Sequence, residues 1–213
     1  GALGVRKMGA MRDGEEELGA DHVQTLKVLA EELGARSEMR EVFQREARQV
    51  AALDHPNIVA VQDSGVIDGR LFMAMELVEG RTLDALITAE GKIAVLESLR
   101  VARQVLEALD YAHGQQVVHR DVRPANVMRS TAGLVKLMDF GLARRAAPGS
   151  PVIAGSPAYL SPEQLLGVGV DWRSDLFAMG VTLYEMLSGQ LPFVGSDRTS
   201  RPRPLRELTP TVP

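Results

Sequence analysis

The sequence contains no cysteine, which excludes disulfide bonds and thiolate metal sites. It also lacks a long apolar run: the stretch Leu176–Leu187 is interrupted by Thr182 and Glu185 and is too short to span a bilayer. Residues 1–11 lack the apolar region of a signal peptide. The net charge of −4 gives no basic surface for nucleic acid. We therefore expect a cytoplasmic protein with no membrane segment and no nucleic-acid partner.

What is present suits a packed domain. Of the 213 residues, 45% are hydrophobic and 24% are charged, which allows a sizeable core in one large domain or two small lobes. Residues before Gly80 mostly alternate as strands do, and residues after it follow the period of amphipathic helices. This change predicts an α+β fold with a small β-rich domain over residues 1–78 and a mainly helical domain over 79–213.

Hydrophobic periodicity and turn residues place the elements. We expect one helix over 38–53, whose apolar stripe includes Glu46. The remaining expected elements are strands at 23–29, 58–63 and 71–75, helices at 82–88, 96–113 and 174–188, and a hairpin of 127–129 with 134–138. The last stretch, 192–213, is rich in Pro and Arg and shows no clear element.

The strongest chemical pattern is the run His119-Arg-Asp-Val-Arg-Pro-Ala-Asn126, followed by Asp139-Phe-Gly141. Asn126 comes directly before the first strand of the predicted hairpin, and Asp139 comes directly after the second. Antiparallel pairing makes these two ends neighbours. An amide oxygen beside a carboxylate suits a hard cation such as Mg²⁺. Asp121, on the loop that leads to the same place, is suited to accept or orient a hydroxyl proton.

These motifs resemble the eukaryotic-type protein kinase family, and most of all its bacterial Ser/Thr members. The resemblance runs from about Val23 to the end of the chain and includes His55-Pro-Asn-Ile-Val59 and Gly155-Ser-Pro-Ala-Tyr-Leu-Ser-Pro-Glu-Gln164. It implies a two-lobed fold that transfers the γ-phosphoryl group of Mg-ATP to protein Ser or Thr. It assigns Asp121 as the catalytic base and Asn126 and Asp139 as Mg²⁺ ligands. Arg123 stands where Ser/Thr kinases usually place a lysine near the γ-phosphate.

The same resemblance assigns nucleotide contacts in the first domain. It pairs Lys27 with Glu46 and places Lys27 on the α- and β-phosphates, while Glu76 and Val78 belong to the segment that bonds adenine. A buried carboxylate and a strand-face lysine have complementary needs. Each residue also has an ordinary interpretation, since Glu46 can extend to solvent, Lys27 can be an edge-strand lysine, and 75–78 can be a buried strand.

Further assignments concern the segment after the metal loop. Ser161-Pro-Glu163 resembles the motif that closes a kinase activation segment, and Ser156 stands where the substrate residue is seated. Ser150 is a candidate for regulatory phosphorylation or a plain loop serine. Asp175 resembles the aspartate that braces the catalytic loop, and its alternative is a helix cap.

Two regions depart from the family. Gly4, Gly9 and Gly14 do not fit the spacing of a phosphate-covering glycine loop, and Glu15–Glu17 would repel a triphosphate. Thr25 replaces the usual small alanine against adenine. We also expect the second domain to be truncated, because the family continues through more helices after Phe193, and Glu163 then lacks its usual arginine partner.

Three functions follow as hypotheses. The first is a Ser/Thr protein kinase, the second a nucleotide-binding scaffold without turnover, and the third a small-molecule phosphotransferase. The segment 155–163 argues against the third, because it matches a peptide-substrate platform. The protein substrate, the oligomeric state, and regulation by dimerisation or autophosphorylation stay open.

Overall fold

The computed structural model describes residues 24–28, 37–67, 70–140, 157–193 and 195–212. The chain forms two compact units, the first of residues 1–54 and 59–78 and the second of residues 55–58 and 79–213. Residues 55–58 therefore group with the second unit, although they precede the last strands of the first.

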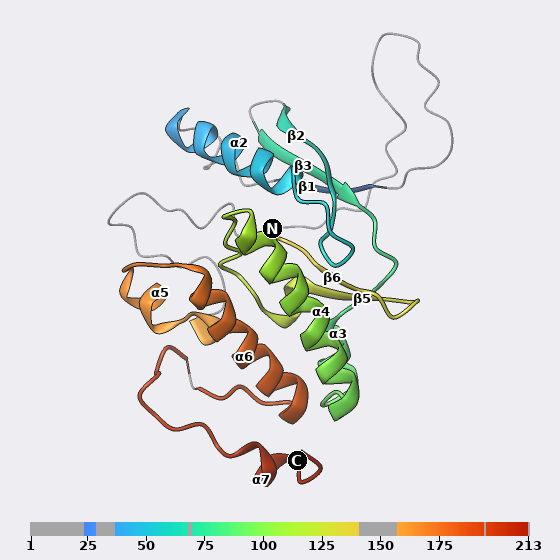
Figure 1. The fold of residues 1–213 in the computed structure, drawn as a ribbon, viewed down its shortest axis with the longest axis vertical. Coiled ribbons are helices and arrows are strands. Elements are labelled where there is room, and N and C mark those ends of the chain that lie inside the picture. The colour runs from blue at the N-terminus through green and yellow to red at the C-terminus, as the bar shows by residue number, and fades with distance from the viewer. Residues whose placement is uncertain (1–23, 29–36, 68–69, 141–156, 194, 213) are drawn as a thin grey trace. The chain divides into compact units, whose positions relative to one another are not determined.

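The smaller unit is a three-stranded antiparallel sheet with one helix. The strands are β1 (Gln24–Val28), β2 (Val61–Ile67) and β3 (Arg70–Glu76), in the order β1-β3-β2. The helix α2 (Ser37–Ala51) packs against β2 (Figure 1). Ala47, Val50 and Leu53 are buried, so this part of the predicted apolar stripe is confirmed.

The predicted strand over 58–63 is wrong in its position. Ile58 makes an isolated parallel bridge to Leu137 of the larger unit, and its N–H donates to His55 O at 3.0 Å. The ladder with β3 begins only at Val61, and a register shift lies between Val61 and Asp63. A run of β-branched residues crosses from one unit into the next here, so local pattern alone could not locate the strand.

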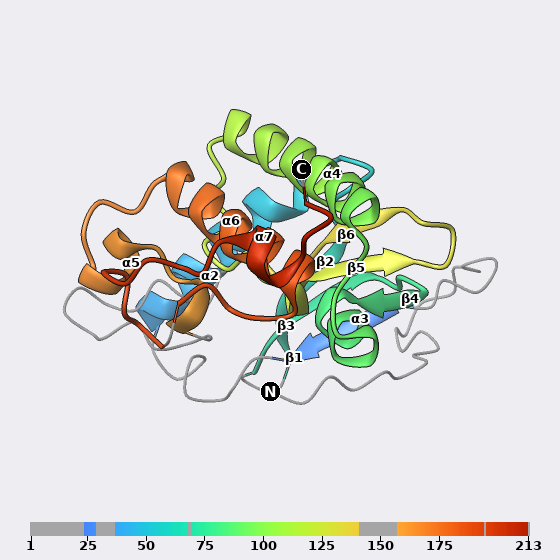
Figure 2. The ribbon, with the colours of Figure 1, turned by 90° about the horizontal axis from the view of Figure 1, so that it is seen from below.

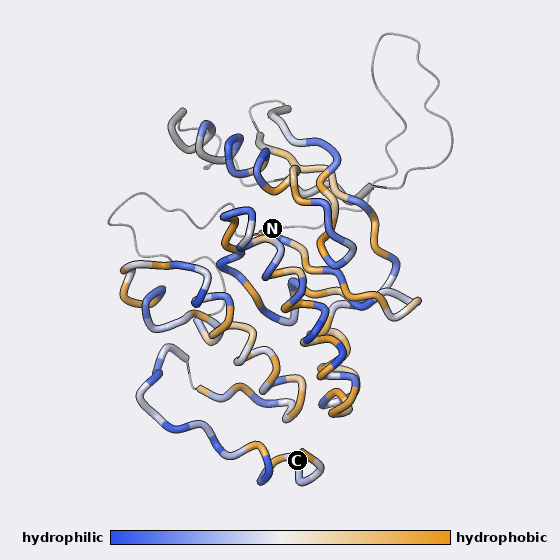
Figure 3. The backbone as a smooth tube through the Cα atoms, viewed as in Figure 1, coloured by the Kyte–Doolittle hydropathy of each residue, from blue (hydrophilic) through white to orange (hydrophobic). Residues whose placement is uncertain are grey.

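The larger unit contains a second sheet and most of the helices. Strands β4 (Gly80–Thr82), β5 (Val127–Ser130) and β6 (Val135–Leu137) pair antiparallel in that order (Figure 2). The helices are α3 (Leu83–Glu90), α4 (Val95–Gly114), α5 (Pro162–Leu166), α6 (Trp172–Ser188) and α7 (Leu205–Leu208), with short 3₁₀ turns η1 (Pro124–Asn126) and η3 (Pro157–Tyr159). The helices α4 and α6 pack against each other. The connection from α6 to α7 is mainly hydrophilic (Figure 3).

The ends of α6 show why it forms where it does. The Asp171 side chain accepts the Arg173 N–H at 2.8 Å and so caps the first turn. Gly189 ends the helix in the left-handed conformation with φ 71°. Between these caps the buried side chains include Ala178, Met179 and Met186.

The predicted α+β fold class is confirmed by a small sheet unit and a mainly helical unit. Among the described residues, no helix is both long enough and apolar enough to cross a bilayer. The sequence predicted α4 and α6 within two residues at each end. It missed β4, α5 and α7, which are three, five and four residues long.

Candidate catalytic loop

The predicted hairpin is confirmed, and it places Asn126 beside the residues that precede Asp139. Val127 pairs with Leu137, and the Met138 N–H donates to Asn126 O at 2.9 Å. Asp139 follows directly with φ 62°, in the left-handed region. An aspartate tolerates this conformation better than most residues, and the turn takes the chain out of the sheet at this point.

The side chain of Asn126 is held by the loop that contains Asp121. Its Nδ2 donates to the Asp121 carbonyl oxygen at 2.7 Å, and the residue is only 3% exposed. Pro124 opens the short turn η1 with its fixed φ, and the Asn126 N–H closes it on Arg123 O at 2.9 Å. Because the amide nitrogen is bound to the loop, the amide oxygen is the atom left with metal-ligand chemistry.

Asp121 and Arg123 form an ion pair within this loop. Arg123 Nε lies 3.6 Å from Asp121 Oδ1, and both side chains are partly exposed. The pair places a positive charge next to the carboxylate that the sequence predicts to be reactive.

His119 stabilises the loop that contains Asp121 as a buried neutral imidazole. Its Nδ1 accepts the Asp121 N–H at 3.1 Å, which leaves Nε2 as the donor to Met138 O at 3.0 Å. Burial lowers the pKa of His119 against the opposing effects of Asp175 and Asp121. Its ring packs at 4.5 Å from the Phe140 ring. One side chain thus connects the loop around Asp121 with the strand end that precedes Asp139.

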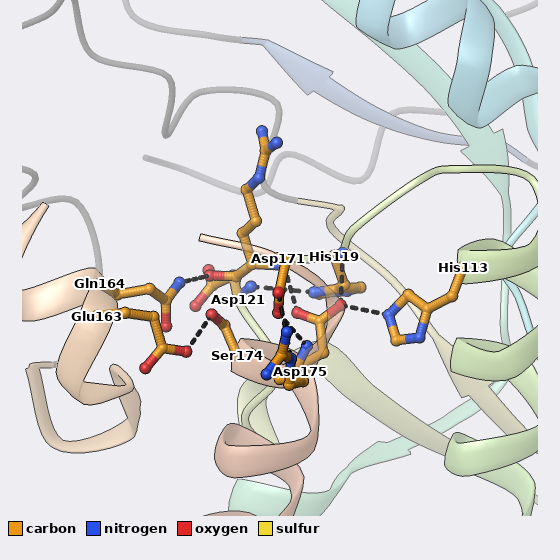
Figure 4. Close-up of polar contacts among 10 residues, drawn as sticks. His113, His119, Asp121, Glu163, Gln164, Asp171, Ser174 and Asp175 are labelled. Carbon is orange, nitrogen blue, oxygen red and sulfur yellow. Dashed lines mark hydrogen bonds and ion pairs between the residues drawn. The ribbon is translucent and has the colours of Figure 1, made fainter. Parts of the chain in front are cut away.

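Asp175 of α6 braces the same loop, as Figure 4 shows. Its carboxylate accepts the N–H groups of His119 at 2.8 Å and Arg120 at 2.7 Å, and it lies 2.8 Å from His113 Nε2. Asp175 is fully buried, and Arg120 adopts φ 65°. Between the two alternatives for Asp175, the structure shows the brace, since the cap of α6 is Asp171.

The helix α5 contacts the loop from another side. Gln164 Nε2 donates to Arg120 O at 3.0 Å, directly before Asp121. Gln164 is also held by a capping box, in which Ser161 and Gln164 bond reciprocally. The sequence pattern Ser-Pro-Glu-Gln carries the signal of that box, and our sequence analysis missed the role of Gln164.

Glu163 has a hydrogen-bond partner on α6, while the expectation that it lacks its usual arginine partner stays a prediction. The Ser174 hydroxyl donates to Glu163 Oε1. Although burial acts in the opposite direction, hydrogen bonds led by that from Ser174 lower the pKa of Glu163. Ser174 of α6 therefore helps to keep the Glu163 carboxylate ionised.

The remaining site residues belong to the smaller unit. Glu46 lies on α2 and is 9% exposed. Lys27 pairs with Met73 in the backbone ladder, and its side chain lies outside the described residues. Glu76 ends β3, and its Oε1 accepts the Ala60 N–H at 3.1 Å. Val78 is half-buried. The predicted pairing of Lys27 with Glu46 stays a prediction.

Several predicted positions fall outside the described part of the chain. They are the glycines at 4, 9 and 14, the acidic run 15–17, Gly141, Ser150 and Ser156.

Comparison with known proteins agrees with this geometry. Residues 8–208 match the family model of the protein kinase domain. The chain is 40% identical over 184 residues to Serine/threonine-protein kinase PknB of Mycobacterium leprae, covering 82% of this chain and 30% of that protein. It is 37% identical over 189 residues to Serine/threonine-protein kinase PrkC of Bacillus subtilis, covering 87% and 29%. The crystal structure of the Mycobacterium tuberculosis PknI kinase domain superposes with a TM-score of 0.74 at 35% identity, covering 89% of this chain and 72% of that one. This chain thus spans about a third of the length of these curated relatives.

Proposed function

Because this chain belongs to the protein kinase domain family, we propose that it transfers the γ-phosphoryl group of ATP to serine or threonine hydroxyls of proteins. The observation that carries the proposal is the fixed arrangement of the loop 119–126. There Asp121 is braced by His119 on one side, and Asn126 is bonded back to Asp121 O at 2.7 Å. Phosphoryl transfer depends mainly on positioning and charge stabilisation, and a loop held at this many points supplies both.

In this proposal each residue has one task. Asp121 accepts the proton of the attacking hydroxyl and orients it, and Arg123 stabilises negative charge on the transferred group. Lys27 contacts the α- and β-phosphates and is held by Glu46, and Glu76 and Val78 bond adenine. These four roles come from the resemblance to the family.

The residues present also suit a magnesium ion. Asn126 offers an amide oxygen and Asp139 a carboxylate, and the hairpin places the two residues at adjacent chain ends. Mg²⁺ prefers oxygen ligands and is bound by one or two protein groups together with substrate phosphates and water. When bound there, it would neutralise charge on the phosphates. The proposal places the reaction in the cytoplasm, where Mg-ATP is abundant.

The test compares wild type with Asp121→Asn for transfer of labelled phosphate from Mg-ATP to a generic protein substrate. We expect wild type to label the substrate and Asp121→Asn to lose at least about a hundredfold in rate, as the loss of a general base does. Asp110→Asn, an exposed aspartate of α4, is the matched control and should keep the wild-type rate. Equal rates for wild type and Asp121→Asn would refute the proposed catalysis.

A scaffold that binds nucleotide without turnover is the second candidate. The observation that favours it is the sequence of residues 4–17, whose glycines do not fit a phosphate-covering loop and whose glutamates would repel phosphates. A rise in melting temperature with Mg-ATP but no phosphate transfer would support this candidate. Turnover that depends on Asp121 would exclude it.

A further inference from the structure

Arg198, in the connection between α6 and α7, has all five of its guanidinium N–H donors directed at backbone carbonyls. Three of these carbonyls belong to the segment 157–160. Nε donates to Leu160 O at 3.1 Å, and Nη2 donates to Pro157 O at 2.6 Å and Ala158 O at 2.9 Å. A guanidinium has five N–H groups in a rigid plane, so this residue uses its full capacity within the fold.

The other contacts of Arg198 hold its own loop in place. Nη1 donates to Gly195 O and Asp197 O, each at 3.1 Å. The guanidinium lies 4.9 Å from the centre of the Phe193 ring and 5.8 Å from that of Phe177, and the two rings are stacked with their planes 11° apart. Arg198 therefore joins three parts of the larger unit: its own loop, the ring pair of Phe177 in α6 and Phe193 beyond it, and the segment 157–160.

That segment precedes α5, and α5 contacts the loop 119–126. Leu160, which is 7% exposed, precedes Ser161, the cap of α5. One turn later, Gln164 Nε2 donates to the carbonyl oxygen before Asp121. Tyr159, within the segment, donates its hydroxyl to Glu185 of α6. The position of the segment relative to Asp121 is thus set at one end by Gln164 and along its length by Arg198 and Tyr159.

From these contacts we propose that Arg198 is a positioning residue for the polypeptide acceptor, acting through the segment 157–160 beside Asp121. This rests on the proposed kinase function. Arg198 has no donor left for the acceptor itself, so its effect passes through the backbone it holds. Loss of three charge-assisted hydrogen bonds would let the segment move and weaken acceptor binding. The loop 119–126 keeps its own contacts with Asp175 and His119, so the transfer step and ATP binding are left largely intact.

The test measures steady-state KM for a protein acceptor and for ATP, with kcat, for wild type, Arg198→Met and Arg198→Lys. We expect Arg198→Met to raise the acceptor KM about tenfold, while kcat and the KM for ATP stay within about twofold. Arg198→Lys keeps the charge but has three donors without the planar fork, so it should give only partial recovery of the acceptor KM. Arg201→Met, an exposed arginine in the same connection, is the matched control and should behave as wild type.

The outcomes separate the inference from the proposed function. If wild type transfers phosphate and the acceptor KM of Arg198→Met is unchanged, the role of Arg198 is refuted and the kinase function stands. The role is also refuted if Arg198→Met lowers kcat and raises both KM values by similar factors, because that would indicate a general loss of stability. It is refuted as well if Arg198→Lys restores the acceptor KM fully, because charge alone would then suffice. If wild type transfers no phosphate, the proposed function and the role of Arg198 both fail.

Discussion

Asp175 shows how one buried carboxylate can fix a loop that carries chemistry. It accepts two consecutive backbone N–H groups, those of His119 and Arg120, and it contacts His113 from α4. The two carboxylate oxygens of Asp175 allow Arg120 to keep a positive φ, a conformation that costs a non-glycine residue about 1–3 kcal/mol. The conformation of the loop at Asp121 therefore depends on a residue more than fifty positions away.

Replacing this carboxylate tests the brace. Asp175→Asn keeps the shape but replaces one acceptor oxygen with an N–H₂ group that faces donors, so we expect the free energy of unfolding to fall by about 3 kcal/mol. Urea unfolding measures this change. Asp171→Asn is the matched control: Asn caps a helix as well as Asp does, and the change should stay below about 0.5 kcal/mol. Equal effects of the two substitutions would show that Asp175 is an ordinary helix-terminus acid.

Arg123 gives a second prediction at this scale, on activity. Its Nε lies 3.6 Å from Asp121, so its charge is fixed next to the proposed base. Arg123→Met should lower kcat about a hundredfold, because a positioned cation stabilises the charge that develops on a transferred phosphoryl group. Arg123→Lys should keep most of the rate, since a lysine is common at this position in the family. A rate for Arg123→Met equal to that of wild type would contradict this role.

Among the elements, the ones with long periodic patterns could be predicted from the sequence, and the ones made by tertiary pairing could not. The helices α4 and α6 and the hairpin of β5 and β6 carry their own periodicity and turn residues. Strand β4 is only three residues long and exists because Gly80 approaches Arg129 of β5, where a Cβ would overlap the Arg129 carbonyl oxygen. Such a short strand has no pattern to detect.

The two left-handed glycines that end α5 and α6 allow a matched prediction. Gly167 and Gly189 have φ of 69° and 71°, but only Gly189 lies against another segment, where an added Cβ would overlap Gly91 O. Gly167→Ala should cost about 1–2 kcal/mol for the left-handed conformation alone. Gly189→Ala should cost about 1–3 kcal/mol more, from overpacking between the ends of α3 and α6. Thermal or urea unfolding of the two variants measures the difference, and equal losses would mean that the contact with Gly91 relaxes freely.

For the molecule as a whole, the sequence predicted the fold class and the neighbouring ends at Asn126 and Asp139, because both follow from local patterns joined by one hairpin. It could not predict contacts that depend on packing between distant segments. Gln164, Ser174 and Arg198 reach their partners only after α5, α6 and the following connection have folded together. Their spacing in the sequence carries no sign of these contacts beyond the capping box at Ser161.

Two ionisable groups, the buried His119 and the half-buried Glu185, make the stability of the molecule depend on pH in opposing ways. Burial lowers the pKa of His119 from 6.5, so the unfolded state binds the proton first and stability is lost as the pH falls below 6.5. Burial, assisted by Asp84 and opposed by the hydrogen bond from Tyr159, raises the pKa of Glu185 from 4.5. The folded state then binds that proton first, so this contribution is present below pH 4.5 and is lost as the pH rises through the folded pKa.

Two variants of the Tyr159–Glu185 contact test the contribution of Glu185 to this pH dependence. Glu185→Gln removes the titrating carboxyl. Wild type loses the contribution of that carboxyl as the pH rises, so the stability of the variant relative to wild type should rise between about pH 4.5 and pH 7. Tyr159→Phe removes the hydrogen bond that holds down the pKa of Glu185, so this pKa rises further and stability should decline more steeply with pH than in wild type. Urea unfolding at several pH values across this range measures both slopes. The two substitutions should change the slope of unfolding free energy against pH in opposite directions. Parallel curves for wild type and both variants would show that Glu185 stays ionised in the fold and contributes nothing to the pH dependence.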